Sequence, residues 1–433
     1  MTTSKVRLNQ QQATREGATS MARIRGLRLG VLRSRDARLS IELGLATALG
    51  PLGGFVSNIV IARTLGASGR GELAAIVAAL AVCEAVLAFG LPDIVARYIA
   101  KGIIPPGSQR TLAVGAVAAS IIPGVVVALY CHSWSFSWPI SIGAALLVPW
   151  TTATVIGRGV VLGHHAYRKL TASQLVGGIF RLLAPLTLIL VDDPTENMGL
   201  AVVLSYIVAA SIPIFWYRPF AGRAAPVRQV IPLLRESLIV WPVYAAWPIY
   251  MYLDQLVLSA VVSPADLGRY AVCAGIAQAP AALASGPRQI LLARAAKSQN
   301  LDEIPTIAQS FLAAGIVGGA ACGFLAGPIL EAIFGPEFRG ISAILGLLVA
   351  ACGFDIALGM LNTGLLAVGR VRSSAINQGV ALVLTAAALP IAVSLGGSII
   401  WAAIVRLSAS AVAFSLARLN VRQFSRSQES TSD

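Results

Sequence analysis

Long stretches without a charged side chain constrain this sequence more than any other feature. Residues 111–157 and 373–405 include no Asp, Glu, Lys or Arg. A helix that spans a bilayer needs about 20 mostly apolar residues, so each stretch is too long for one span. Polar or glycine-containing segments at 132–139 and 396–398 divide each stretch into a helical pair. We therefore expect transmembrane helices at both places.

The composition of the whole chain supports the same conclusion. Charged residues make up 12% of the 433 residues, and hydrophobic residues make up 56%. Soluble domains carry roughly 25% charged residues, so this composition excludes an ordinary water-soluble enzyme. It also excludes a disordered chain, because such chains contain few apolar residues. In total we expect twelve spans, near residues 42–64, 73–92, 111–131, 140–162, 171–191, 198–217, 237–262, 267–290, 306–328, 341–368, 374–394 and 399–417.

The basic residues indicate how these spans are oriented. The chain has 33 Lys and Arg against 19 Asp and Glu, a net charge of +14. Most of the basic residues fall in the two tails and in alternate connections, which the positive-inside rule places in the cytoplasm. Four arginines remain for the outer side, namely Arg63, Arg70, Arg269 and Arg339. We therefore expect both termini in the cytoplasm. The basic tail could bind anionic membrane lipid, and we expect no nucleic acid as a partner. The alternative, which we favour for the tail, is that its charge only sets the orientation of the spans.

This topology divides the chain into five parts. They are a basic tail (1–39), a first lobe of six spans (40–217), a basic cytoplasmic linker (218–236), a second lobe of six spans (237–417) and a cytoplasmic tail (418–433). Two local patterns recur across the linker. The segment Ser68-Gly-Arg-Gly-Glu-Leu-Ala74 is similar to Leu267-Gly-Arg-Tyr-Ala-Val-Cys273, and the segment 90–101 is similar to 286–297. Because both matches keep their order and place, we expect two lobes related by an internal repeat, with substrate bound between them.

Nothing in the sequence indicates a metal site, a cofactor or an enzyme. The five cysteines lie in or beside apolar spans without C-x-x-C spacing, which is typical of small buried side chains. The three histidines have no further ligands at a recognisable spacing. No connection carries a nucleotide-binding motif or a carboxylate cluster for a metal. We therefore expect no metal, no cofactor and no catalytic residues.

Several segments, in order over most of the chain, resemble one known family. The chain resembles the Wzx-type polysaccharide flippases of the multidrug/oligosaccharidyl-lipid/polysaccharide (MOP) exporter superfamily. The segments that carry the resemblance are Asn58-Ile-Val-Ile-Ala-Arg63-Thr-Leu-Gly66, Gly69-Arg-Gly71, Phe89-Gly-Leu-Pro92, Asp254-Gln-Leu-Val-Leu, Leu267-Gly-Arg-Tyr270-Ala, Ile333-Phe-Gly-Pro-Glu-Phe338 and Leu365-Leu-Ala-Val-Gly-Arg370.

The resemblance implies both a fold and an activity. The fold is an all-α polytopic membrane protein of the MATE-like MOP type, with about twelve transmembrane helices in two six-helix lobes. The activity is to move a sugar or oligosaccharide linked to polyprenyl phosphate or pyrophosphate to the outer leaflet of the bacterial plasma membrane. The implied partners are this lipid-linked substrate and the proteins that assemble the cell-envelope polysaccharide.

Arginines within or beside the spans are the candidates for binding a phosphate headgroup. A charge inside the bilayer costs roughly 2.5 to 3.5 kcal/mol, so it normally faces a partner or a wet cavity. Arg63, Arg181 and Arg288 are the candidates, because a guanidinium binds phosphate oxygens bidentately and stays charged. The alternatives are a salt bridge, with Glu84 as one partner for Arg181, or snorkelling to the interface for Arg63 and Arg288. Asp355 and Arg406 lie at similar depth in the second lobe, which favours a structural pair.

Span 7 carries a second set of candidates. Pro242 and Pro248 interrupt it, and Tyr244, Trp247, Met251 and Asp254 recur on one helical face. A broken helix with an aromatic face suits a cavity that receives sugar rings, so Trp247 and Asp254 are predicted to bind substrate. Glu84 or Asp254 could also bind a coupling proton or sodium ion. The alternatives are aromatic packing for the tryptophan and charge balance for the carboxylates.

Three other functions are compatible with parts of this pattern. A multidrug antiporter of the same superfamily would share the fold, but its cationic substrate would favour acidic residues in the cavity. A membrane enzyme such as a sugar polymerase would need a larger outer segment than the sequence provides. A non-transporting component of a cell-wall assembly complex remains open.

Overall fold

The computed structural model describes residues 35–188 and 222–432, apart from residues 135, 165, 299, 300 and 397. Every regular element in these ranges is a helix, so the predicted all-α fold is confirmed. The elements are α2 (Arg35–Leu87), α3 (Leu91–Ala100), α4 (Ser108–Ala119), α5 (Ile121–Ser133), α6 (Trp138–Gly163), α7 (Tyr167–Leu188), α9 (Val227–Leu258), α10 (Pro264–Ser298), α11 (Glu303–Phe334), the 3-10 helix η1 (Pro336–Phe338), α12 (Ser342–Ala367), α13 (Val371–Gly396) and α14 (Ile399–Ser432).

The predicted spans coincide with helices wherever the structure describes them. Spans 42–64 and 73–92 lie mostly in the two arms of α2, which turns at Gly66 with φ +66° and ψ −169°. Glycine adopts this left-handed conformation without a steric penalty, which explains the residue at the turn. The span predicted at 198–217 lies outside the described residues.

Fewer helices meet a strict test of length and apolar composition. Six of the described helical segments are long and apolar enough to cross a membrane, or seven if the bent pair 54–87 and 91–100 forms one span. The count of twelve therefore stays a prediction.

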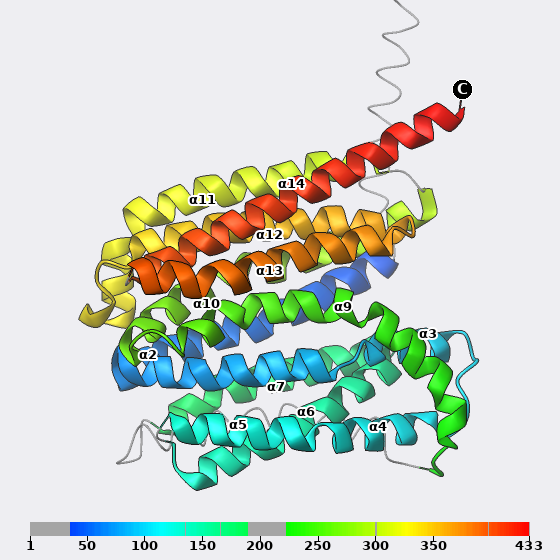
Figure 1. Cartoon of the computed structure of the whole chain (residues 1–433), viewed down its shortest axis with the longest axis horizontal. Coiled ribbons are helices and arrows are strands. Elements are labelled where there is room, and N and C mark those ends of the chain that lie inside the picture. Colours follow the sequence, from blue (N-terminus) through cyan, green and yellow to red (C-terminus); the bar gives the residue numbers. More distant parts are fainter. Residues whose placement is uncertain are drawn as a thin grey trace, which may run out of the picture.

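Helices α2 to α7 form the first group. Figure 1 shows α4, α5 and α6 on one side of the molecule, beneath α2 and α7. Helix α6 packs against α3, α4 and α5, and α2 packs against α7. Ala144 and Leu147 of α6 are fully buried, and they belong to a cluster that also contains Ile76 of α2. This apolar core holds the first group together.

Helices α9 to α14 form the second group, and α12 is its central helix. Helix α12 packs against α10, α11 and α14. Most of its residues are buried, as expected of a helix that is apolar all round. In contrast, apolar side chains on outer helices are exposed, and the most exposed of them are Phe324 (89%), Leu395 (84%) and Ile122 (75%). Exposed apolar surface of this kind is what a protein that faces lipid requires.

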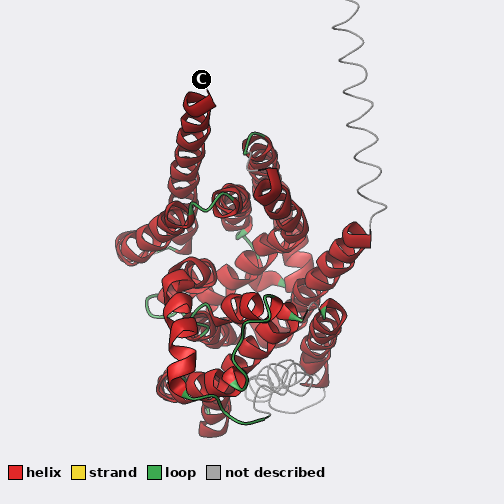
Figure 2. Cartoon of the chain, turned by 90° about the vertical axis from the view of Figure 1, so that its right-hand side faces the viewer, coloured by secondary structure: helices red, strands yellow, loops and turns green. Residues whose placement is uncertain are grey.

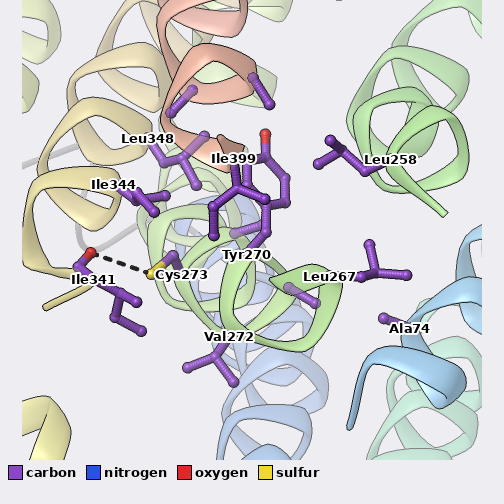
Figure 3. Close-up of a cluster of buried hydrophobic side chains, with 14 of the residues drawn as sticks. Ala74, Leu258, Leu267, Tyr270, Val272, Cys273, Ile341, Ile344, Leu348 and Ile399 are labelled. Carbon is purple, nitrogen blue, oxygen red and sulfur yellow. Dashed lines mark hydrogen bonds between the residues drawn. The ribbon is translucent and has the colours of Figure 1, made fainter. Parts of the chain in front are cut away.

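The two groups meet chiefly where α10 and α9 pack on α2. A large buried cluster joins them, and Figure 3 shows Ala74 of α2 opposite Leu267 of α10. Beside this cluster the backbones of α2 and α10 are in direct contact. A β-carbon on Gly71 would collide with the carbonyl oxygen of Pro264, and one on Gly268 would collide with that of Ala67. The contact thus requires glycine on both helices, and it lies within the segments that the sequence repeat singled out.

Part of the predicted linker is helical. Helix α9 begins at Val227, and Val230 and Leu233 on its first turns are buried against the first group. The end-on view of Figure 2 shows helices joined by short loops throughout the described part of the chain. Three prolines, Pro232, Pro242 and Pro248, lie inside α9, which bends along its length in Figure 1.

Candidate functional site

A buried cluster of charges occupies the interior of the second group of helices. Arg406 of α14 donates from Nη1 to Oδ2 of Asp254 on α9 at 2.9 Å. It also donates from Nη2 to Oδ2 of Asp355 on α12 at 3.1 Å. The pairing of Asp355 with Arg406 confirms the prediction from the sequence. Asp254 and Asp355 are each 1% exposed and Arg406 is 4% exposed, so all three charges are removed from solvent.

Hydroxyl groups complete the hydrogen bonds of both carboxylates. Tyr270 donates to Oδ2 of Asp254 at 2.7 Å, and the backbone N–H of Gln255 donates to Oδ1 at 2.8 Å. Ser410 donates to Oδ1 of Asp355 at 2.7 Å. Every carboxylate oxygen of the cluster therefore has a donor, as a stable buried polar network requires.

The guanidinium is held by further contacts. It lies over the ring of Tyr250, with Cζ 4.1 Å from the ring centroid. Its Nη1 also donates to the backbone oxygen of Tyr250 at 3.1 Å. Its Nε has no hydrogen-bond partner among the described residues. These contacts fix the position of Arg406 between α9, α12 and α14, so the cluster ties three helices together.

A small cavity adjoins the charge cluster. Its volume is about 10 Å³, which matches roughly one water molecule. The residues that line it are Met251, Asp254, Ala274, Ala277, Gln278, Leu348, Cys352, Asp355 and Arg406. The predicted stripe on span 7 therefore reaches this cavity through Met251 and Asp254. In the present conformation this space can hold one water molecule, whereas a sugar ring is too large for it.

The other predicted site residues lie on different elements. Trp247 is half-buried and packs against the core of the second group, with its ring 6.4 Å from that of Tyr250. Arg288 of α10 is half-buried, and its Nε donates to Oγ1 of Thr363 on α12 at 2.7 Å. Glu84 is half-buried in the second arm of α2. The side chain of Arg181, in α7, lies outside what the structure describes.

Arg63 of α2 lies at the contact between the two groups, beside the end of α11. Its side chain is exposed, and its Nε donates to the backbone oxygen of Ile333 at 2.6 Å. Its Nη2 donates to the backbone oxygen of Ala332. Both acceptors are in the last turn of α11, where backbone carbonyls lack helical partners and a cation is favourable. The present conformation thus joins Arg63 to the end of a helix.

Glu337 forms a second polar link at the same end of the molecule, and no role for it was predicted from the sequence. Its Oε2 accepts a hydrogen bond from the backbone N–H of Ala67 at 2.6 Å. Arg269 donates from Nε to the backbone oxygen of Glu337 at 2.9 Å. Three of the arginines that the topology predicts to be outside lie here. Arg63 and Arg339 contact α11, and Arg269 contacts η1. The Phe-Gly-Pro-Glu-Phe segment carried the resemblance, but no spacing rule links its carboxylate to a turn 270 residues earlier.

Comparison with known proteins adds a family and several related folds. A family model described as polysaccharide biosynthesis protein matches residues 40–291. No curated protein matches the chain. A structure described as lipid II flippase MurJ in an inward closed conformation is similar at a TM-score of 0.68 and 12% identity, over 88% of this chain and 87% of that one.

Two MATE transporters share the fold as well. An inward-facing multidrug resistance MATE family transporter of the MOP superfamily is similar at a TM-score of 0.64 and 13% identity, over 89% of this chain and 99% of that one. A MATE transporter of Vibrio cholerae is similar at a TM-score of 0.55 and 13% identity, over 89% and 98% of the two chains. These identities are low, so the likeness establishes the MOP fold and nothing finer. Together with the family match over residues 40–291, this likeness bears out the resemblance that the sequence indicates.

Proposed function

This chain belongs to the polysaccharide biosynthesis protein family, and from that membership we propose that it is a flippase for lipid-linked sugars. The proposed substrate is a sugar or oligosaccharide on a polyprenyl phosphate or pyrophosphate. The direction is from the inner to the outer leaflet of a bacterial plasma membrane. The observation that carries the proposal is the family match over residues 40–291, which places the chain in polysaccharide biosynthesis.

The fold supports transport rather than catalysis. Two groups of helices that meet through a cluster at one end can separate there while they approach at the other. Such movement exposes a central site to each side of the membrane in turn. In this proposal the moving bodies are residues 40–217 and 237–417, and both termini and the linker 218–236 are cytoplasmic. The basic tails and linker would bind anionic lipid headgroups there.

The membrane potential favours movement of the anionic headgroup from the inner to the outer leaflet. The phosphate and sugar groups need a wet path across the hydrocarbon, whereas the polyprenyl chain stays in lipid. A membrane potential that is negative inside favours outward movement of an anion by about 2.3 kcal/mol per charge per 100 mV. Coupling to an ion would then matter mainly for the return of the empty carrier.

Individual residues receive proposed roles within this scheme. Arg181 and Arg288 would bind the phosphate groups, and Trp247 would pack against a sugar ring. Arg63 could join them only after it leaves the carbonyl groups of α11. Glu84 is a candidate for ion coupling.

Asp254 needs a separate account. Its oxygens are occupied by Arg406, Tyr270 and the N–H of Gln255. A role in substrate binding or ion coupling therefore requires a conformation in which Arg406 neutralises Asp355 alone.

Depletion of the protein in its host tests the proposed function. We expect a lipid-linked sugar to accumulate in the inner leaflet, where a membrane-impermeant reagent added to spheroplasts cannot modify it. Restoring the wild-type chain should return the sugar to the outer leaflet. Unchanged access of the reagent, together with a new sensitivity to cationic drugs, would instead identify a multidrug antiporter. Unchanged access without drug sensitivity would favour a non-transporting role beside polysaccharide assembly proteins.

A further inference from the structure

We propose that Arg63 and Glu337 form a two-armed latch that holds the outer end of the protein closed. The latch consists of Arg63 with the carbonyl groups of Ala332 and Ile333, and of Glu337 with the N–H of Ala67. The inference rests on the proposed function, because only a carrier that opens outward needs such a latch. It goes beyond that function because it names the contacts that must break on each cycle.

The first arm runs from the first group of helices to the second. Arg63 is on α2, and the carbonyl groups of Ala332 and Ile333 are at the end of α11. A guanidinium that takes two carbonyl groups at a helix end satisfies acceptors that the helix itself leaves open. It also places a positive charge at the negative end of the helix dipole. Arg63 is exposed, so solvent can replace these carbonyl groups when the arm opens.

The second arm runs in the opposite direction. Glu337 is on η1 of the second group, and the N–H of Ala67 follows the turn of α2 at Gly66. The left-handed turn favours glycine at position 66, and a β-carbon there would lie 2.8 Å from Oε2 of Glu337, so the missing side chain leaves room for the carboxylate. A charged acceptor makes this hydrogen bond stronger than one between neutral groups.

A third contact supports the position of Glu337. Arg269 donates to its backbone oxygen at 2.9 Å and to Oδ1 of Asp266 at 3.0 Å. Arg269 thereby fixes η1 relative to the start of α10. The neighbouring residue Gly268 contacts the backbone of α2 directly. The bond from Arg269 to Glu337 therefore connects the latch to the interface between the two groups.

The chemistry of the latch suits a contact that opens repeatedly. Both arms join a charged side chain to backbone groups at the end or turn of a helix. Water can take over each of these bonds, so the net free energy of each is modest although the bonds are directional. A closed end held in this way opens without exposing an unpaired buried charge.

Reaction of a buried cysteine with an impermeant maleimide measures opening of this end. The parent variant carries Ala74→Cys with the five native cysteines replaced by alanine. Ala74 is 1% exposed and lies opposite Leu267, so its thiol reacts only when the two groups separate. In right-side-out vesicles we expect Arg63→Gln and Glu337→Gln each to raise the labelling rate about tenfold, equivalent to 1.4 kcal/mol.

Matched controls come from a pair at the same end that stays within one group. Arg339 and Glu331 lie 3.7 Å apart and are both partly exposed. Arg339→Gln and Glu331→Gln remove the same charges, and we expect labelling within twofold of the parent. Arg63→Lys keeps a positive charge near α11 but cannot bind both carbonyl groups as the guanidinium does. Its labelling rate should therefore lie between that of the parent and that of Arg63→Gln.

The result that overturns the latch is a labelling rate in Glu337→Gln and Arg63→Gln equal to that of the parent at equal membrane abundance. An equal rise in all four Gln variants would also overturn it, because general loss of charge would then be the cause. The assay needs no substrate. The expected labelling rates in a protein that does not move lipid-linked sugars would contradict the proposed function but would still support the latch.

Discussion

The guanidinium of Arg406 lies 2.9 Å from a carboxylate oxygen of Asp254, although the two residues are 152 positions apart. Both side chains are buried, and the same guanidinium also binds Asp355 at 3.1 Å. The cluster therefore contains two carboxylates for one positive charge. Arg406 is its central member, because among the described residues it is the one cation that pairs with both carboxylates.

Arg406→Met should destabilise the protein strongly. The substitution leaves two carboxylates buried without a counter-charge, and breaking a buried pair in this way costs about 3–5 kcal/mol. The measurement is the midpoint of thermal unfolding in detergent, together with the amount of protein in the membrane. Arg422→Met on the same helix is the control, because Arg422 is exposed and its loss should change stability by at most about 0.5 kcal/mol. Equal effects of the two variants would contradict this account of the cluster.

Loss of the charge on Asp254 should destabilise the protein less than loss of the charge on Arg406. Asp254→Asn leaves Arg406 paired with Asp355, and the amide can still accept from Tyr270. We expect a loss of about 1–3 kcal/mol, smaller than that of Arg406→Met. The same unfolding measurement checks the order of the two variants. Reversal of the order would contradict the central place of Arg406 in the cluster.

Gly268→Ala should disturb the contact between the two groups of helices. A β-carbon at this position meets the carbonyl oxygen of Ala67 and the backbone N of Gly71, neither of which can move alone. Overpacking of this kind costs about 1–3 kcal/mol, and we expect faster labelling of Ala74→Cys. Gly379→Ala is the matched control, because nothing lies within 4 Å of its added carbon. It should instead stabilise α13 by about 0.5–1 kcal/mol. Similar behaviour of the two alanine variants would remove any special role for the glycine contact.

Arg288→Gln should lower transport more than it lowers stability. If Arg288 binds the phosphate headgroup, transport falls at least about tenfold at unchanged membrane abundance, the equivalent of 1.4 kcal/mol. Thr363→Val is the comparison, because it leaves Arg288 in place and removes the hydroxyl that accepts from Arg288 at 2.7 Å and donates to the backbone oxygen of Gly359 at 2.7 Å. If both variants lose transport to the same extent, the role of Arg288 is to bind Thr363 rather than the substrate.

Much of the fold could be predicted because apolar spans and basic connections leave a clear signal in the sequence. The turn at Gly66 falls between the predicted spans 42–64 and 73–92. The pairing of Asp355 with Arg406 was predicted, since two opposite charges at one depth in a membrane favour a pair. The inclusion of Asp254 in that cluster was not predicted. It depends on the way α9 is placed against α14, and no local pattern specifies that placement.

The contacts of Arg63 and Glu337 could not be predicted from the sequence for a different reason. Both side chains bind backbone groups, so no complementary residue type marks their partners in the sequence. The sequence alone therefore groups Arg63 with Arg181 and Arg288 as a candidate headgroup ligand, with snorkelling as the alternative. Its observed partners in this conformation are the last carbonyl groups of α11.

Movement of a lipid-linked sugar by the purified protein in liposomes is the decisive test of the proposed flippase activity. The liposomes carry, in both leaflets, a polyprenyl-diphosphate sugar with a fluorescent group on the sugar, and an impermeant reductant quenches the outer leaflet. The account predicts that the inner-leaflet pool is also quenched over time with the wild-type protein, but not in empty liposomes or with a phospholipid that carries the same fluorophore. An inner-leaflet pool that stays protected in the presence of folded protein would contradict it.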